Sequence, residues 1–124
     1  MRSTALFDNL VFHDDKPYSE PLYVDNHGRI LRFMLKPGQV IKEHRTPTSP
    51  FYVTILKGEG IFTDGEGQEH KVVPNDFLVF DAGEKHSVRA GDNEFIFLGI
   101  LQSAPNVRSD HVSGTMVRNT DTVE

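Results

Sequence analysis

Short apolar runs follow one another along most of this chain, and clusters of Gly, Pro, Asn or Asp interrupt them about every ten residues. The runs are rich in Val, Ile, Leu and Phe, and helical periodicity is hard to find among them. This spacing is typical of an all-β sandwich or barrel. We therefore predict strands over residues 21–25, 29–35, 38–43, 51–57, 59–63, 68–73, 77–80, 86–90 and 94–101.

The turns and the faces of the strands follow from the same pattern. We expect strand reversals at Pro37-Gly38, Asp64-Gly65 and Ala90-Gly91-Asp92, with glycine supplying the positive φ that tight hairpins need. Alternation within 51–57 separates an inner face from an outer face that carries Tyr52 and Leu56. The residues expected to be mostly core are Phe51, Val53, Ile55, Phe62, Phe77, Val79, Phe95 and Phe97.

The chain divides into three parts around one domain. A length of 124 residues suits a single compact core. Residues 1–20 are moderately apolar and are predicted to pack on the barrel or on a second copy, and residues 21–102 form the barrel. Residues 103–124 are predicted to be a polar, partly disordered tail, in which a short strand near 115–117 stays open.

Composition excludes several classes of function. The net charge is -5 with no basic stripe, which argues against nucleic acid as a partner. The absence of cysteine excludes disulfides, thiolate metal sites and a cysteine nucleophile. We see neither a signal peptide nor a run long enough to span a membrane, so we expect a soluble, cytoplasmic protein.

Two linked motifs in residues 28–101 resemble those of the cupin superfamily. Gly38 and His44, followed by Gly58, have the spacing of the first cupin motif. Residues 81–86 (DAGEKH) resemble the Pro-x-Gly-x-x-His turn of the second motif, and Asn75-Asp76 stands where cupins usually have Gly-Asp. The resemblance implies a small single-domain cupin, a double-stranded β-helix or jelly-roll barrel that often holds a divalent metal on three histidines and one glutamate.

The resemblance carries over only part of that metal site. His44 and His86 fall on the first and third histidines, whereas Thr46 stands at the second. Either Phe51 or, after a shift of one residue, Pro50 stands at the glutamate. Two imidazoles are fewer donors than iron or zinc sites require. We therefore expect a degenerate site with weak affinity, or none, for Fe, Zn, Ni or Mn.

Other titratable residues have plainer interpretations. His70 is expected to be an exposed strand histidine, and His13, His27 and His111 are expected to be solvated. Glu43, Asp76, Asp81 and Glu84 flank the expected pocket, where a carboxylate beside a histidine could form an acid–base pair. Charges in turns are ordinarily solvated, so we favour that interpretation.

Three hypotheses for function remain. The first is a small-molecule binding protein with a partly apolar pocket, anchored by His44 and His86 and lined by Thr46, Phe51, Val53 and Phe97. The second is a metal-dependent dioxygenase or isomerase with a further ligand that the sequence does not identify. The third is a homodimeric interaction module with a vestigial pocket. A homodimer fits all three, because exposed edge strands are commonly covered by a second subunit.

Overall fold

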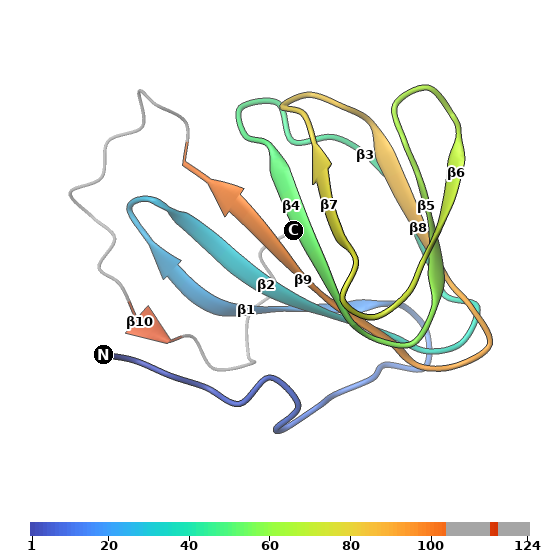
Figure 1. The fold of residues 1–124 in the computed structure, drawn as a ribbon. Helices are drawn as coiled ribbons and strands as arrows, with labels where there is room; N and C mark the ends of the chain where they lie inside the picture. The colour runs from blue at the N-terminus through green and yellow to red at the C-terminus, as the bar shows by residue number, and fades with distance from the viewer. Residues whose placement is uncertain (104–114, 117–124) are drawn as a thin grey trace.

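The computed structural model describes residues 1–103 and 115–116, and its regular structure consists of strands (Figure 1). They are β1 (Tyr18–Asp25), β2 (Gly28–Leu35), β3 (Val40–His44), β4 (Phe51–Lys57), β5 (Gly60–Thr63), β6 (Glu69–Val72), β7 (Phe77–Phe80), β8 (His86–Ala90), β9 (Phe95–Gln102) and β10 (Thr115–Met116). Across these described residues, no helix is long and apolar enough to cross a membrane. The nine predicted strands are all present, and the largest difference in boundaries is at β1, which begins at Tyr18 rather than at residue 21.

The strands form two facing antiparallel sheets. The larger sheet has the order β10-β1-β2-β9-β4-β7, and the smaller has the order β3-β8-β5-β6. The two sheets therefore face each other with β3 near the β1–β2 end and β6 near β7. This is the predicted all-β jelly roll.

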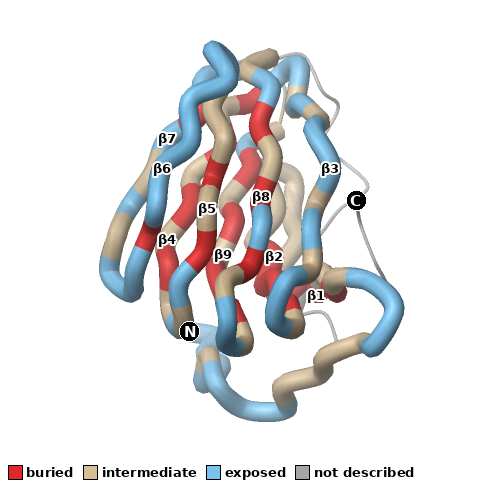
Figure 2. Tube along the Cα trace, turned by 90° about the vertical axis from the view of Figure 1, so that its right-hand side faces the viewer, coloured by how far each residue is buried: buried red, intermediate tan, exposed pale blue. Residues whose placement is uncertain are grey.

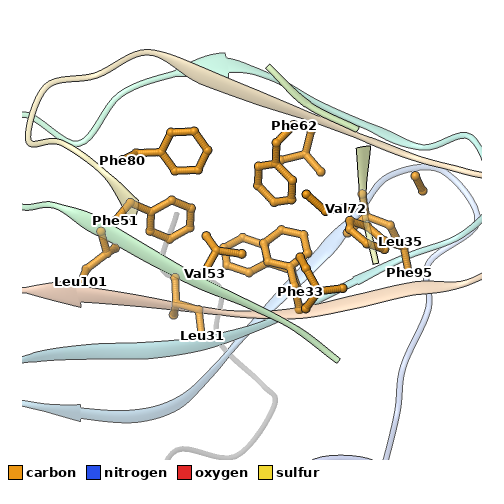
Figure 3. Packing of buried hydrophobic residues seen from close by; sticks show 14 residues of the cluster. Leu31, Phe33, Leu35, Phe51, Val53, Phe62, Val72, Phe80, Phe95 and Leu101 are labelled. Carbon is orange, nitrogen blue, oxygen red and sulfur yellow. The ribbon is translucent and has the colours of Figure 1, made fainter. Parts of the chain in front are cut away.

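Alternation along the strands builds the core between the sheets, as predicted for β4. Phe51, Val53 and Ile55 are buried, whereas Tyr52 and Leu56 are only partly buried on the outer face. Figure 3 shows the aromatic and aliphatic side chains that fill the interior, and Figure 2 shows burial concentrated on the central strands. The core cluster consists of Leu31, Phe33, Leu35, Phe51, Val53, Ile55, Phe62, Val72, Phe80, Val88, Ala90, Phe95, Phe97 and Leu101.

The prediction for β7 is wrong in its choice of face. Phe77 is 61% exposed and Val79 is 52% exposed. Leu78 and Phe80 instead pack against the core, because the pleat turns alternate side chains to opposite faces. Phe77 lies on the outer face, stacked on Tyr52 with 6.5 Å between ring centroids.

The predicted turns occur at the expected positions, but the residue that adopts a positive φ is not always the predicted one. Gly38 has φ 76°, as expected, whereas Gly65 and Gly91 do not have positive φ. In the loop between β5 and β6 the left-handed residue is Gly67, with φ 84°, and its N–H donates to the carbonyl of Asp64. The reversal therefore uses a longer loop with glycine near its end instead of a tight turn at Asp64-Gly65.

The N-terminal segment covers part of the outer face of the larger sheet. Leu10, Val11 and Phe12 pack against a cluster that includes Met34. Arg32 is buried in the same region, where it pairs with Glu20 at 2.5 Å and donates to the carbonyls of Leu6 and Asp8. In this single chain the segment thus lies on its own barrel, and its contact with a second copy stays a prediction.

Most of the predicted polar tail lies outside the described residues. The structure does place β10 beside β1, with Met116 opposite Tyr23 and Thr115 opposite Val24. A short strand therefore occurs within the region 115–117 that the sequence left open.

Candidate functional site

The two motif histidines lie opposite each other on neighbouring strands. In the β3–β8 pair, Ile41 lies opposite Val88 and His44 lies opposite His86, so β3 has one more residue than β8 between these positions. Such a bulge re-aims the side chains that follow it. Without the extra residue Glu43 would lie opposite His86. The bulge is therefore what turns His44, and not a carboxylate, toward the interior.

Aromatic rings enclose His86. The residue is 1% exposed, and its ring stacks on Phe51 at 5.0 Å and on Phe80 at 4.7 Å between centroids. The ring of His44 meets it edge-on at 4.3 Å, at an interplanar angle of 67°. The end of the barrel that holds these histidines is consequently filled by rings.

Backbone carbonyls fix the orientation of both imidazoles. Nδ1 of His44 lies 2.9 Å from the carbonyl of Lys42, and Nδ1 of His86 lies 3.1 Å from the carbonyl of Glu84. Because a carbonyl oxygen accepts and does not donate, each Nδ1 carries the hydrogen. Nε2 of His86 is left as a buried acceptor with no hydrogen-bond partner in the structure.

Burial keeps His86 neutral. Desolvation, followed by the charge of nearby His44, lowers the pKa of His86 from 6.5 to about 4, against a smaller opposing effect of the Glu84 carbonyl. A neutral imidazole with a hydrogen on Nδ1 suits packing between phenylalanine rings.

The residues present do not fit the divalent metal that the cupin resemblance implies. The hydroxyl of Thr46 donates to the carbonyl of Ser49 and is engaged within its own loop. Of the two candidates for the glutamate position, it is Phe51 whose ring contacts His86. Among the described residues, no group of three or more His, Cys, Asp or Glu side chains is placed to hold a metal. Two nitrogen donors beside an apolar ring do not replace the hydration shell of a divalent cation.

Three of the four predicted ligand-binding residues lie in the packed core. Val53 and Phe97 are fully buried, and Phe97 stacks on Phe33 with 4.6 Å between centroids. Phe51 is buried as well, and Thr46 lies in the loop between β3 and β4. Figure 3 shows Phe33, Phe51, Phe62 and Phe80 filling the interior. Phenylalanine side chains thus fill the described core, and the two cavities considered next are lined mainly by residues outside it.

The larger cavity lies where β3 faces the β1–β2 side of the other sheet. We call it the β3 cavity, and its volume is about 580 Å³. Its lining consists of Lys16, Pro17, Ser19, Phe33, Val40, Ile41, Lys42, Glu43, His44 and Arg45. Phe33 and Ile41 belong to or pack on the core, whereas β3 itself is largely exposed, as Figure 2 shows. The cavity therefore has an apolar floor and a polar rim, and His44 is the one predicted site residue that lines it.

A smaller cavity lies where β5 and β6 face β7. We call it the β7 cavity; its volume is about 260 Å³, and its lining consists of Phe62, Asp64, His70, Leu78, Val79, Phe80 and Glu84. The Asp64 carboxylate lies 2.7 Å from Nε2 of His70 and accepts from the N–H groups of Glu66 and Gln68. Together these interactions, with that of His70 the largest, lower the pKa of Asp64.

Sequence reasoning missed the pair of Asp64 and His70, although it was right that His70 is exposed. The two residues are diagonal neighbours across the hairpin, because Phe62 lies opposite His70 and Thr63 opposite Glu69. Correct assignment of the hairpin register would have found them.

Two of the four acidic residues near the expected pocket accept hydrogen bonds from the backbone. Glu84 accepts from the N–H of Gly65 and from that of Asp81, and Asp76 accepts from the N–H of Val73. Glu43 lines the β3 cavity. In the described part of the chain, none of these carboxylates, including Asp81, bonds to the ring of His44 or His86.

Comparison with known proteins supports the family and the fold. The family model of the cupin domain matches residues 31–100. No curated protein matches the chain.

Several solved structures share the fold. A protein of Thermus thermophilus is 24% identical with a TM-score of 0.78, over 85% of this chain and 100% of that one. An RmlC-like cupin protein of Desulfovibrio desulfuricans is 24% identical with a TM-score of 0.73, over 82% and 96%. A conserved protein of Klebsiella pneumoniae with a double-stranded β-helix domain is 18% identical with a TM-score of 0.77, over 95% and 98%.

Proposed function

This chain belongs to the cupin domain family, and from that premise we propose that it binds a small, partly apolar molecule without a resident metal. The observation that carries the proposal is the β3 cavity, whose floor is formed by Phe33 and Ile41 and whose lining includes His44. A volume of about 580 Å³ lies within the range of small-molecule sites. The ligand therefore lies beside the histidine pair and not in the barrel interior.

The packing around His86 supports binding without turnover. Phe51 stands where the resemblance expects a carboxylate, and its ring stacks on His86. General acid–base chemistry needs a titrating group within reach of the substrate, and burial holds the pKa of His86 near 4. In this arrangement His44 contributes a polar contact to the ligand, and the ring of His86 packs against the ring of His44.

A neutral fluorescent probe tests this proposal. N-phenyl-1-naphthylamine should bind the wild-type chain with increased emission, and Val40→Trp should abolish the signal by filling the cavity. Val40 is 48% exposed and lines the cavity, so the larger side chain should not disturb the core. The matched control is Phe77→Trp, at an exposed position on the outer face. Loss of binding in Phe77→Trp but not in Val40→Trp would place the probe on the outer face and refute the proposal.

The alternative is a metal-dependent enzyme that uses His44 and His86 with a further ligand. The observation in its favour is Nε2 of His86, which is buried without a partner. Elemental analysis of protein purified without chelator separates the two functions. About one equivalent of metal that disappears in the His44→Ala/His86→Ala variant would show that the histidines hold a metal and would reopen the enzyme hypothesis. We expect sub-stoichiometric metal that is equal in both proteins.

A further inference from the structure

The described lysines and arginines divide into those that have a partner and those that have none. Five of them form ion pairs with carboxylates: Arg32, Lys36, Lys57, Lys71 and Arg89. Arg2 lies over the ring of Tyr23, and Arg29 also has an interaction. The cations that have no such partner among the described residues are Lys16, Lys42, Arg45 and Lys85. Three of these four line the β3 cavity.

The lining of the β3 cavity has a positive net charge, whereas the whole chain has a negative one. The net charge is -5, yet the cavity carries Lys16, Lys42 and Arg45 against the single carboxylate of Glu43. Like charges around one concavity repel each other, and the repulsion is relieved when an anion binds there. Single solvated cations are ordinary on protein surfaces, whereas three unpaired cations around one apolar cavity form a complementary site for an anion.

The β7 cavity provides an internal comparison. Its charged lining residues are Asp64, Glu84 and His70, with no lysine or arginine. Its carboxylates already accept hydrogen bonds from the protein itself. The β3 cavity thus differs from the β7 cavity in the sign of its unpaired charge.

We infer that the β3 cavity takes a small organic anion: a carboxylate on a compact apolar or aromatic body. The apolar body lies on Phe33 and Ile41, and the carboxylate lies at the rim near Lys42 and Arg45. Long cationic side chains can reach over the mouth of the cavity while their stems cover its apolar wall. This inference rests on the proposed function and specifies the ligand class of that site.

A pair of ligands that differ only in charge tests the inference. Calorimetric titration compares 1-naphthoate with the neutral 1-naphthamide, which has nearly the same size and shape. We expect the wild-type chain to bind naphthoate about tenfold more tightly, with each exposed cation contributing roughly twofold to fivefold. Raising the salt concentration should weaken the binding of naphthoate but not that of naphthamide.

Charge-removing variants locate the effect. The triple variant Lys16→Gln/Lys42→Gln/Arg45→Gln should reduce the affinity for naphthoate to that for naphthamide. Lys85→Gln is the matched control, because Lys85 is also unpaired but does not line the cavity. An equal loss of affinity in Lys85→Gln would assign the preference to the overall field of the protein and overturn the inference.

The possible failures are distinguishable. Equal affinity of the wild-type chain for the two ligands would overturn the anion preference and leave small-molecule binding intact. Binding of neither ligand, together with no signal from N-phenyl-1-naphthylamine, would overturn the proposed function itself.

Discussion

The β3 cavity and the β7 cavity differ in how their charged lining residues are paired. At the β7 cavity the carboxylates are used by the protein: Asp64 bonds to His70 and to two backbone N–H groups, and Glu84 bonds to two more. At the β3 cavity Lys42 and Arg45 have no carboxylate partner in the described chain. At the β7 cavity the carboxylates are thus used in hydrogen bonds of the protein itself, whereas at the β3 cavity these two cations have no ion-pair partner among the described residues.

The difference distinguishes charged residues that stabilise the fold from charged residues that remain available to bind a ligand. A carboxylate that accepts several backbone hydrogen bonds orders a loop, and its removal affects stability. A cation without a partner contributes little to stability, and its removal affects binding. This criterion favours the β3 cavity as the proposed binding site, although the β7 cavity contains the aspartate–histidine pair that more closely resembles a catalytic arrangement.

A wall of rings separates the two cavities. His44 lines the β3 cavity, Phe80 lines the β7 cavity, and His86 contacts both of them as well as Phe51.

The largest effect is expected from removal of a ring of the wall. Phe51→Ala should lower the free energy of unfolding by about 4 kcal/mol, because a buried phenylalanine is replaced by a cavity. Exposed Phe77 provides the control, and Phe77→Ala should cost less than about 1 kcal/mol. Urea denaturation measures both. In the Phe51→Ala variant, water that reaches His86 should also raise the pKa of His86 toward 6.5, and an NMR titration measures this pKa. A value that stays near 4 would show that the Phe51 ring does not shield His86 from water.

The next largest effect is a dependence of stability on pH that arises from the lowered pKa of His86. The pKa of His86 is about 4 in the folded chain, against 6.5 for an unperturbed histidine. Between these values the unfolded chain binds a proton that the folded chain does not bind. The free energy of unfolding should therefore fall as the pH is lowered from about 6.5 to about 4, by about 2 kcal/mol.

The variant His86→Phe isolates this contribution. It keeps a ring between Phe51 and Phe80, and it removes both the titrating group and the unpartnered Nε2. Denaturation curves at several pH values should show a smaller loss of stability in the variant over the same range. Identical pH profiles for the two proteins would mean that His86 is hydrated in solution.

The fold was predictable because strand signals and turn signals agree along most of the chain. Alternation in 51–57 identified the buried face of β4 correctly. It failed for β7, where the run FLVF contains four apolar residues and offers no polar position to mark the outer face. Asn75 replaces a glycine that the family resemblance expects, and it still adopts a positive φ of 78°, which asparagine tolerates better than most residues.

The site was predictable only in part. The motif spacing identified His44 and His86 as neighbours, and the structure places them opposite each other. The β3 cavity was not predictable, because it depends on a bulge in β3 and on the distance between two sheet edges that are remote in sequence. Its cations also looked like ordinary surface charges, since only the folded chain shows which cations have partners.

The smallest expected effect is the difference in the free energy of unfolding between two variants, Glu84→Gln at the β7 cavity and Lys42→Gln at the β3 cavity. Both substitutions replace a charged side chain at the lining of a cavity by a neutral amide. Glu84→Gln should lower the free energy of unfolding by about 1 kcal/mol, because the amide offers one acceptor oxygen to the two backbone N–H groups that the carboxylate now serves. Lys42→Gln should change it by less than about 0.5 kcal/mol, because no ion pair is lost. Urea denaturation at neutral pH measures both variants against the wild type. If Lys42→Gln destabilised the chain as much as Glu84→Gln, the cation would be serving the fold, and the contrast between the two cavities would fail.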